Sequence, residues 1–130
     1  MVKVEYHLQA FEERKETIVK WAVEVRGIEN SQRIIGDNAS KAICELLSAF
    51  LLKKKIVELG FQLNNSWFKS ASVFQKLPEF ENKKTVLEKM FSLELTCEKL
   101  SYGAPKPKEL IELVLSLFFE LEKMIKGLLE

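Results

Sequence analysis

Charged side chains set among apolar neighbours are the residues of this sequence most able to form a ligand site. Glu94 shares a predicted helical face with Met90 and Cys97, and Glu45 flanks the apolar stripe of another predicted helix. Moving a carboxylate out of water costs free energy unless it gains a partner. Glu45 and Glu94 are therefore expected to bind either a cation of the chain or a polar ligand.

Three arginines can supply that cation. Arg14 interrupts the first apolar stripe, and Arg26 and Arg33 flank the start of the second predicted helix. We expect one of them to pair with Glu45 or Glu94 inside or at the edge of the core, and the sequence leaves open which one. The alternative interpretation is that these groups line a polar pocket for the phosphate or ribose of a nucleotide.

The motifs of several common catalytic and metal sites are missing. The chain has one histidine, His7, and no Cys-x-x-Cys, which leaves too few ligands for a zinc site. It has no Glu-x-x-His pair for a di-iron site and no Gly-rich phosphate loop. Cys44 and Cys97 lie in apolar helical patterns that are typical of buried free thiols. No metal or cofactor is therefore predicted, and His7 is expected at the surface or at the start of a helix.

The composition argues against two further classes of function. The 130 residues carry 20 Lys and Arg against 19 Asp and Glu, whereas proteins that bind nucleic acid mainly through bulk charge are more basic. No run of about 18 apolar residues predicts a membrane-spanning helix, and the charged N-terminal segment does not resemble a secretory signal. We therefore expect a cytoplasmic protein with no membrane partner.

The candidate site residues are expected on long helices of an all-α protein. Apolar side chains recur every three to four positions over residues 6–25, 32–59 and 83–101, and again after Pro107. Only five Gly and three Pro interrupt the chain, which is typical of long helices joined by few turns. Gly36 lies inside the second segment, where it indicates a close helix crossing. The whole chain is predicted to form a single domain, a four- to five-helix up-down bundle.

The helix after Pro107 has more apolar surface than one core requires. A wide apolar stripe runs along it, and Leu113, Leu115 and Phe119 add apolar surface beyond that stripe. Either this helix is central in the bundle, or one of its faces binds another chain. We expect a homodimer with these three side chains at the interface.

Four segments follow one another in a familiar order: SQRIIGDNASKAICELLSAFLLKK, NNSWF, LPEFEN and LELTCEKLSYGAPKPKEL. The first resembles the second helix of small prokaryotic HEPN proteins, helical bundles named for higher-eukaryote and prokaryote nucleotide binding. The resemblance covers residues 21–119. It implies a dimeric bundle of four or five helices that binds a nucleotide or RNA, or that pairs with a minimal nucleotidyltransferase.

Many HEPN proteins are ribonuclease toxins with an Arg-x4-6-His catalytic motif. In this chain Cys97 and Tyr102 stand where the resemblance would place that Arg and that His. Neither side chain replaces the missing group, because a buried thiol is uncharged and tyrosine, with a pKa of about 10, is a poor base. The resemblance therefore implies a cleft around Glu94, Glu98 and Tyr102 but no cleavage activity.

The sequence thus predicts ligand or cleft residues at Arg33, Glu45, Glu94, Glu98 and Tyr102, and no catalytic residue. The preferred function is a non-catalytic or divergent HEPN-like dimer that binds a nucleotide, RNA or a protein partner. Two alternatives stay open. One is an atypical ribonuclease in which Glu94, Tyr102 and an arginine share the chemistry, and the other is a structural all-α interaction protein without a ligand.

Overall fold

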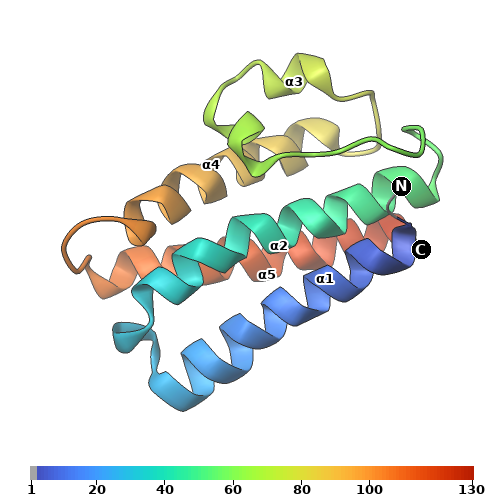
Figure 1. Ribbon diagram of the computed structural model, residues 1–130. Coiled ribbons are helices and arrows are strands. Elements are labelled where there is room, and N and C mark those ends of the chain that lie inside the picture. Colours follow the sequence, from blue (N-terminus) through green and yellow to red (C-terminus); the bar gives the residue numbers. More distant parts are fainter. Residues whose placement is uncertain (1–2) are drawn as a thin grey trace.

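The computed structural model describes residues 3–130, and all regular secondary structure in that range is helical (Figure 1). Four helices are long: α1 (Val4–Glu16), α2 (Gln32–Lys53), α4 (Lys83–Ser101) and α5 (Lys108–Leu129). The shorter segments are the π-helical η1 (Thr17–Arg26), the 3-10 helices η2 (Ile28–Asn30) and η3 (Asn65–Lys69), and the single turn α3 (Val73–Lys76). The prediction of an all-α protein is confirmed, with five α-helices in the described range.

Most predicted helix ends agree with the structure. α4 spans the predicted residues 83–101, and the first predicted helix runs without a break through α1 and η1 as far as Arg26. The last helix begins one residue after Pro107, whose fixed φ and missing N–H suit a position at a helix start.

The C-terminal end of α2 was predicted wrongly. The helix stops at Lys53, and the expected continuation to residue 59 does not form. Lys55 adopts a left-handed φ of 58°, and the N–H of Ile56 donates to the carbonyl of Leu51 at 2.9 Å. A left-handed residue with such a backward hydrogen bond ends a helix. The apolar residues after it continue the sequence pattern, but they pack from a turn.

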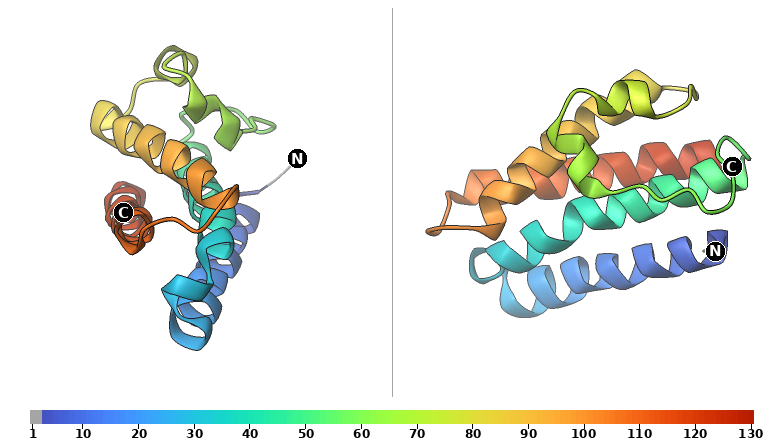
Figure 2. Two further views of the ribbon diagram at one scale, coloured as in Figure 1. Left: turned by 90° about the vertical axis from the view of Figure 1, so that its left-hand side faces the viewer. Right: turned by 45° about the horizontal axis from the view of Figure 1, so that its top comes forward.

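α2 is the central helix of the fold. It packs against α1, α4 and α5, and Figure 2 shows it between α1 on one side and α4 and α5 on the other. Its buried side chains occupy almost the whole circumference between Ile35 and Leu52. The helix therefore presents polar side chains to solvent only along a narrow strip, and this strip lines the site described below.

α5 buries one stripe and exposes another. The buried apolar side chains are Ile111, Val114, Phe118, Leu121 and Ile125. Leu113 is 46% exposed and Phe119 is 43% exposed, whereas Leu115 packs partly against the core. α5 is therefore not the central helix. The other explanation for its extra apolar surface, a second chain that binds its outer face, stays a prediction. Within residues 3–130, no helix is both long enough and apolar enough to cross a membrane.

At Gly36 the helices α2 and α4 approach each other closely. A Cβ atom at this position would lie 2.8 Å from Cβ of Leu100 and 2.9 Å from the carbonyl oxygen of Cys97. The predicted close crossing at Gly36 is confirmed. It fixes the spacing of α2 and α4 beside a small polar pocket.

Candidate ligand-binding site

A polar pocket lies between α2, α4 and η3, next to the Gly36 crossing. Its volume is about 170 Å³, and it brings together three of the predicted site residues, Glu94, Glu98 and Tyr102. Sites for drug-sized ligands usually measure about 300–1,000 Å³. We call this hollow the Glu94 pocket. Its size suits one ring or a similar fragment of a larger ligand.

Glu94 is the most unusual residue of this pocket. The residue is only 4% exposed, and both carboxylate oxygens accept from Nδ2 of Asn65, at 3.1 and 3.3 Å. Glu94 forms no ion pair with any residue in the range 3–130. A carboxylate offers about four lone-pair positions, so the Asn65 amide, which contacts both oxygens, leaves the outer positions of the carboxylate unused.

The rim of the pocket carries charges of both signs and one aromatic ring. Lys41 of α2 and Lys69 of η3 line it, and Lys69 Nζ lies 3.8 Å from a carboxylate oxygen of Glu98. Both side chains of that pair are nearly half exposed, so the pair is weak. Tyr102, also on the lining, is 70% exposed.

The thiols near the pocket are not nucleophiles. Cys97 lines the pocket but is 2% exposed, and burial raises the pKa of its thiol to about 12 despite a backbone hydrogen bond at Ser40 that lowers it. Burial, followed by the nearby Glu94 and Glu45 carboxylates, also raises the pKa of Cys44 well above its usual value. Because the thiolate is the reactive form, both cysteines are inert at neutral pH. The prediction of buried free thiols is confirmed.

The predicted arginine–glutamate ion pair is wrong within the described residues. Arg14 donates to Oδ1 of Asn38 at 3.1 Å, and Arg33 donates to the carbonyl of Gly103 at 3.0 Å. Arg26 bonds the carbonyl of Asn30 in its own turn. Helical spacing identified the faces on which these side chains lie, but the hydrogen-bond partners of the guanidinium groups are an amide and two backbone carbonyls. Arg33 therefore positions the turn beside the Glu94 pocket and does not enter it.

Glu45 instead pairs with His7, which the sequence placed at the surface or at the start of a helix. His7 does lie in the first turn of α1, but its side chain is not at the surface. His7 is 9% exposed, and its Nδ1 lies 2.8 Å from Oε2 of Glu45. Its Nε2 is buried and has no hydrogen-bond partner among the described residues. The burial of His7 could have been predicted from spacing, because His7 precedes the buried Phe11 by four residues and so lies on the same face of α1.

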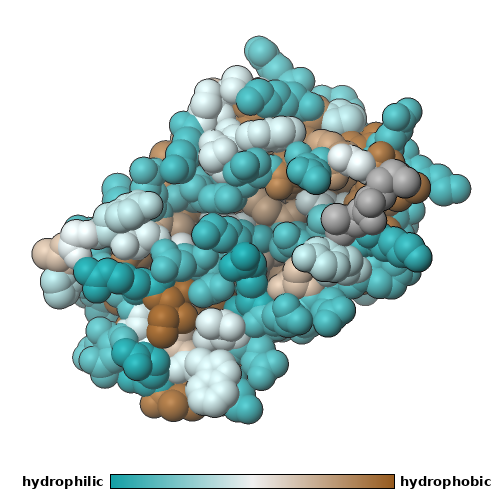
Figure 3. Space-filling view, in the orientation of Figure 1, coloured by the Kyte–Doolittle hydropathy of each residue, from teal (hydrophilic) through white to brown (hydrophobic). Residues whose placement is uncertain are grey.

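A polar groove connects the Glu94 pocket to this histidine. Two further hollows, of about 260 and 320 Å³, adjoin along α2 and share Glu45 and the covering residues Gln62 and Leu63. The nearer one also shares Lys41 and Asn65 with the Glu94 pocket. Hydrophilic side chains dominate the face of the molecule seen in Figure 3. We define the polar groove by five residues in order along it: His7, Glu45, Lys41, Asn65 and Glu94.

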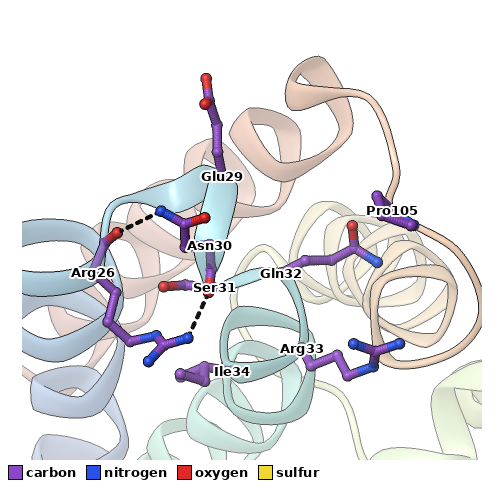
Figure 4. A pocket seen from close by; sticks show the side chains of 8 residues that line it. All are labelled: Arg26, Glu29, Asn30, Ser31, Gln32, Arg33, Ile34 and Pro105. Atoms are coloured by element: carbon purple, nitrogen blue, oxygen red, sulfur yellow. Dashed lines mark hydrogen bonds between the residues drawn. The ribbon is translucent and has the colours of Figure 1, made fainter.

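A separate hollow of about 330 Å³ lies at the start of α2 (Figure 4). It contains two guanidinium groups, from Arg26 and Arg33, which lie on either side of Ile34 and do not converge. Glu29 points away from the hollow. Each arginine already donates to a backbone carbonyl. The polar groove is therefore the better candidate site.

No protein-family model, curated protein sequence or solved structure matches this chain. The HEPN resemblance accordingly stays a prediction. Among residues 3–130, no three His, Cys, Asp or Glu side chains are grouped closely enough to hold a metal ion.

Proposed function

We propose that this chain is a HEPN-like, up-down helical-bundle protein that binds a nucleotide, or the end of an RNA strand, in the polar groove without cleaving it. The observation that carries the proposal is the Glu94 carboxylate. It is buried at the Glu94 pocket, its partner is one amide, and ammonium groups lie at the rim. An acceptor with unused lone pairs in a concave site favours a ligand with N–H or O–H donors.

A nucleotide matches the distribution of groups in the groove. Its base or ribose offers donors to Glu94, and its phosphate suits the ammonium groups of Lys41 and Lys69 at the rim. The exposed ring of Tyr102 can stack on a base, which is how many proteins hold unpaired nucleotides. Two further hollows, of about 260 and 320 Å³, follow the Glu94 pocket along α2.

A binding role fits the groups at the Glu94 pocket better than catalysis does. Cleavage of RNA at its 2′-hydroxyl requires a proton acceptor that works near pH 7 and a cation at the phosphate. The thiol of Cys97, with a pKa of about 12, does not supply such a base. We therefore expect the Glu94 pocket to bind its ligand and release it unchanged.

A ribonuclease that uses His7 and Glu45, in place of the Glu94, Tyr102 and arginine expected from the sequence, is a second candidate. At the far end of the groove, Nδ1 of His7 lies 2.8 Å from Oε2 of Glu45, which orients the ring, but Nε2 is buried and has to be uncovered before it can act as a base. Labelled single-stranded RNA, incubated with the wild type and with His7→Asn, tests this candidate. Cleavage at background level in both samples rules it out.

The proposed oligomer is a homodimer formed through the outer face of α5. Leu113 and Phe119 supply exposed apolar surface there, with Leu115 at its edge. Leu95 of α4 is also 38% exposed. An ion pair between Lys89 of α4 and Glu120 of α5, with a distance of 2.6 Å, joins these two helices. A nucleotidyltransferase is the alternative partner implied by the HEPN resemblance.

Calorimetric titration with the four ribonucleoside monophosphates and a short single-stranded RNA tests the proposal. We expect at least one of these ligands to bind the wild type, and the double variant Lys41→Gln/Lys69→Gln to bind it about 10-fold more weakly because charge-assisted contacts to phosphate are lost. The matched control Lys53→Gln/Lys84→Gln removes two exposed lysines elsewhere and should bind like the wild type. Absence of binding by all five ligands would refute the proposal.

A further inference from the structure

We infer that the Glu94 pocket binds the ribose of the ligand, through the free 2′- and 3′-hydroxyl groups of a mononucleotide or of an RNA 3′ end. The inference rests on the proposed function, because it names the part of the proposed ligand that enters the pocket. Two observations carry it. Ser40 lines the pocket with a buried hydroxyl that has no hydrogen-bond partner among residues 3–130, and Asn65 restricts how a ligand can reach Glu94.

Ser40 differs from the other buried hydroxyl side chains of the fold. Three others are buried, and each donates to a backbone carbonyl at 2.8 to 3.0 Å: those of Ser31, Ser48 and Thr96. Ser40 is 4% exposed and forms no such bond within residues 3–130, yet it lines the Glu94 pocket. A buried polar group costs free energy unless it finds a partner, so this hydroxyl favours a polar ligand in the pocket.

The approach to Glu94 is restricted by Asn65. Nδ2 of Asn65 lies 3.1 and 3.3 Å from the two carboxylate oxygens, and it therefore occupies the fork between them. A base edge with two parallel donors would need the same fork. The outer lone pairs stay free, and each accepts one donor from the side. This arrangement favours a ligand with separate single donors, such as the hydroxyl groups of a sugar, over a planar edge with paired donors.

Glu94 and Ser40 lie on opposite walls of the pocket, one on α4 and the other on α2. The walls are close together, because a Cβ atom at Gly36, one turn before Ser40, would lie 2.9 Å from the carbonyl oxygen of Cys97. Hydroxyl groups on neighbouring carbons suit this space: one donates to the carboxylate, and the other bonds the Ser40 hydroxyl, which both donates and accepts. The volume of about 170 Å³ suits a pentose ring but not a whole nucleotide.

The charges of the pocket separate the sugar from the phosphate. Asp37, Glu94 and Glu98 place carboxylates on the lining, which would repel a phosphate inside the pocket. The ammonium groups of Lys41 and Lys69 attract it at the rim. The ribose therefore lies inside, and the 5′-phosphate and the base stay outside. An internal ribose of RNA has its 3′-oxygen in a phosphodiester, so only the last ribose of a strand offers both hydroxyl groups.

Calorimetric titration with GMP, 2′-deoxy-GMP and 3′-deoxy-GMP tests the ribose assignment. Each deoxy analogue lacks one hydroxyl group and keeps the base and the phosphate. We expect the analogue that loses the bond to Glu94 to bind the wild type about 10- to 100-fold more weakly than GMP, the range for one hydrogen bond to a charged group. The other analogue should bind about 2- to 10-fold more weakly, the range for a neutral hydrogen bond. AMP should bind like GMP, because the base stays outside the pocket.

A short single-stranded RNA tests recognition of the strand end. The strand with a free 3′-hydroxyl should bind more tightly than the same strand with a 3′-phosphate, because that phosphate blocks one hydroxyl group and brings negative charge against Glu94. Equal binding of the two strands would overturn recognition of the RNA 3′ end.

Ser40→Ala removes the hydroxyl without removing a hydrogen bond that the fold forms within residues 3–130. It should bind GMP about 2- to 10-fold more weakly and unfold at the same temperature as the wild type. Ser48→Ala is the matched control on the same helix, since that hydroxyl donates to the carbonyl of Cys44 at 2.8 Å and lies outside the pocket lining. It should leave GMP affinity unchanged. Unaltered GMP affinity in Ser40→Ala would overturn the role of Ser40.

Failure of the inference and failure of the proposed function are separable. Equal binding of GMP and both deoxy analogues would overturn the ribose assignment and leave the proposed nucleotide function standing. Ribose 5-phosphate should bind more weakly than GMP, because it has no base. If it binds as tightly as GMP, the sugar assignment stands and the nucleotide function falls. Failure of every one of these ligands to bind would remove both.

Discussion

Glu122 of α5 shows how this molecule stabilises a buried carboxylate with its own cations. The residue is 8% exposed, and one of its oxygens accepts from Nζ of Lys15 and from Nζ of Lys126, each at 2.7 Å. Glu94 is buried to a similar extent but has one amide as its partner. The contrast between two buried carboxylates in one small fold supports a ligand-binding role for Glu94.

The pairing of Glu122 predicts a pH-dependent contribution to stability. Burial alone would raise its pKa, but the hydrogen bonds and charges of Lys126 and Lys15 outweigh burial and hold the pKa below its usual value. A carboxyl group whose pKa is lower in the folded state stabilises the fold above its unfolded pKa of about 4.3, and that contribution is lost as the pH falls through the folded pKa.

Glu122→Gln should therefore reduce the free energy of unfolding by about 1–3 kcal/mol at pH 7, because two charged hydrogen bonds are weakened. Urea denaturation measures this value, and the difference from the wild type should shrink at pH 3. Glu112→Gln, an exposed position on the same helix, serves as the control and should change little. A Glu122→Gln deficit of the same size at both pH values would contradict this interpretation.

Spacing in the sequence identified Glu45 and Glu94 as candidate site residues but not their partners. Glu94 was expected beside Cys97 on one helical face, and both line the same pocket. Asn65, which binds Glu94, comes from a segment without helical periodicity whose path the sequence did not specify. The pairing of Glu45 with His7 depends in the same way on how closely α1 packs against α2. Partners contributed by loops and by neighbouring helices are set by tertiary packing and not by local pattern.

At the scale of elements, the crossing of α2 and α4 at Gly36 positions the Glu94 pocket. Gly36→Ala would place a methyl group 2.8 Å from Cβ of Leu100 and 2.9 Å from a backbone oxygen, both part of α4. We expect a loss of about 1–3 kcal/mol in the free energy of unfolding from overpacking, which exceeds the gain in helix propensity. Thermal or urea denaturation measures it.

Gly127→Ala is the matched control for that substitution. Gly127 also lies in a long helix, but no atom lies within 4 Å of a Cβ built there. The alanine should therefore stabilise the protein by about 0.5–1 kcal/mol through helix propensity. If both variants are stabilised equally, the helices do not cross as closely at Gly36 as the structure indicates.

The elements themselves were largely predictable because their signals are local. α4 begins after Asn82 and ends before Gly103, and polar or turn-forming residues at both ends mark its limits. α2 was extended too far because the apolar residues after Lys55 continue the helical spacing. Of those residues, Ile56 and Val57 pack against the core from the turn that follows the left-handed Lys55, whereas Leu59 is exposed. Periodicity alone does not distinguish the two arrangements.

At the scale of the whole molecule, the outer face of α5 predicts self-association. Sedimentation equilibrium should give a dimer for the wild type at micromolar concentration. The double variant Leu113→Gln/Phe119→Gln should be monomeric and equally folded, because both side chains are nearly half exposed in the single chain. Leu59→Gln, at a 61% exposed position outside α5, should remain dimeric. A monomeric wild type would contradict the proposed interface.

The location of the ligand is the central claim, and amide chemical shifts measure it directly. In ¹H–¹⁵N correlation spectra of the full chain titrated with GMP, we predict shift changes that cluster in residues 36–41, 65–69 and 94–102, the three segments that form the Glu94 pocket. Spectra that do not change, or changes confined to residues 26–34 at the start of α2, would contradict the account.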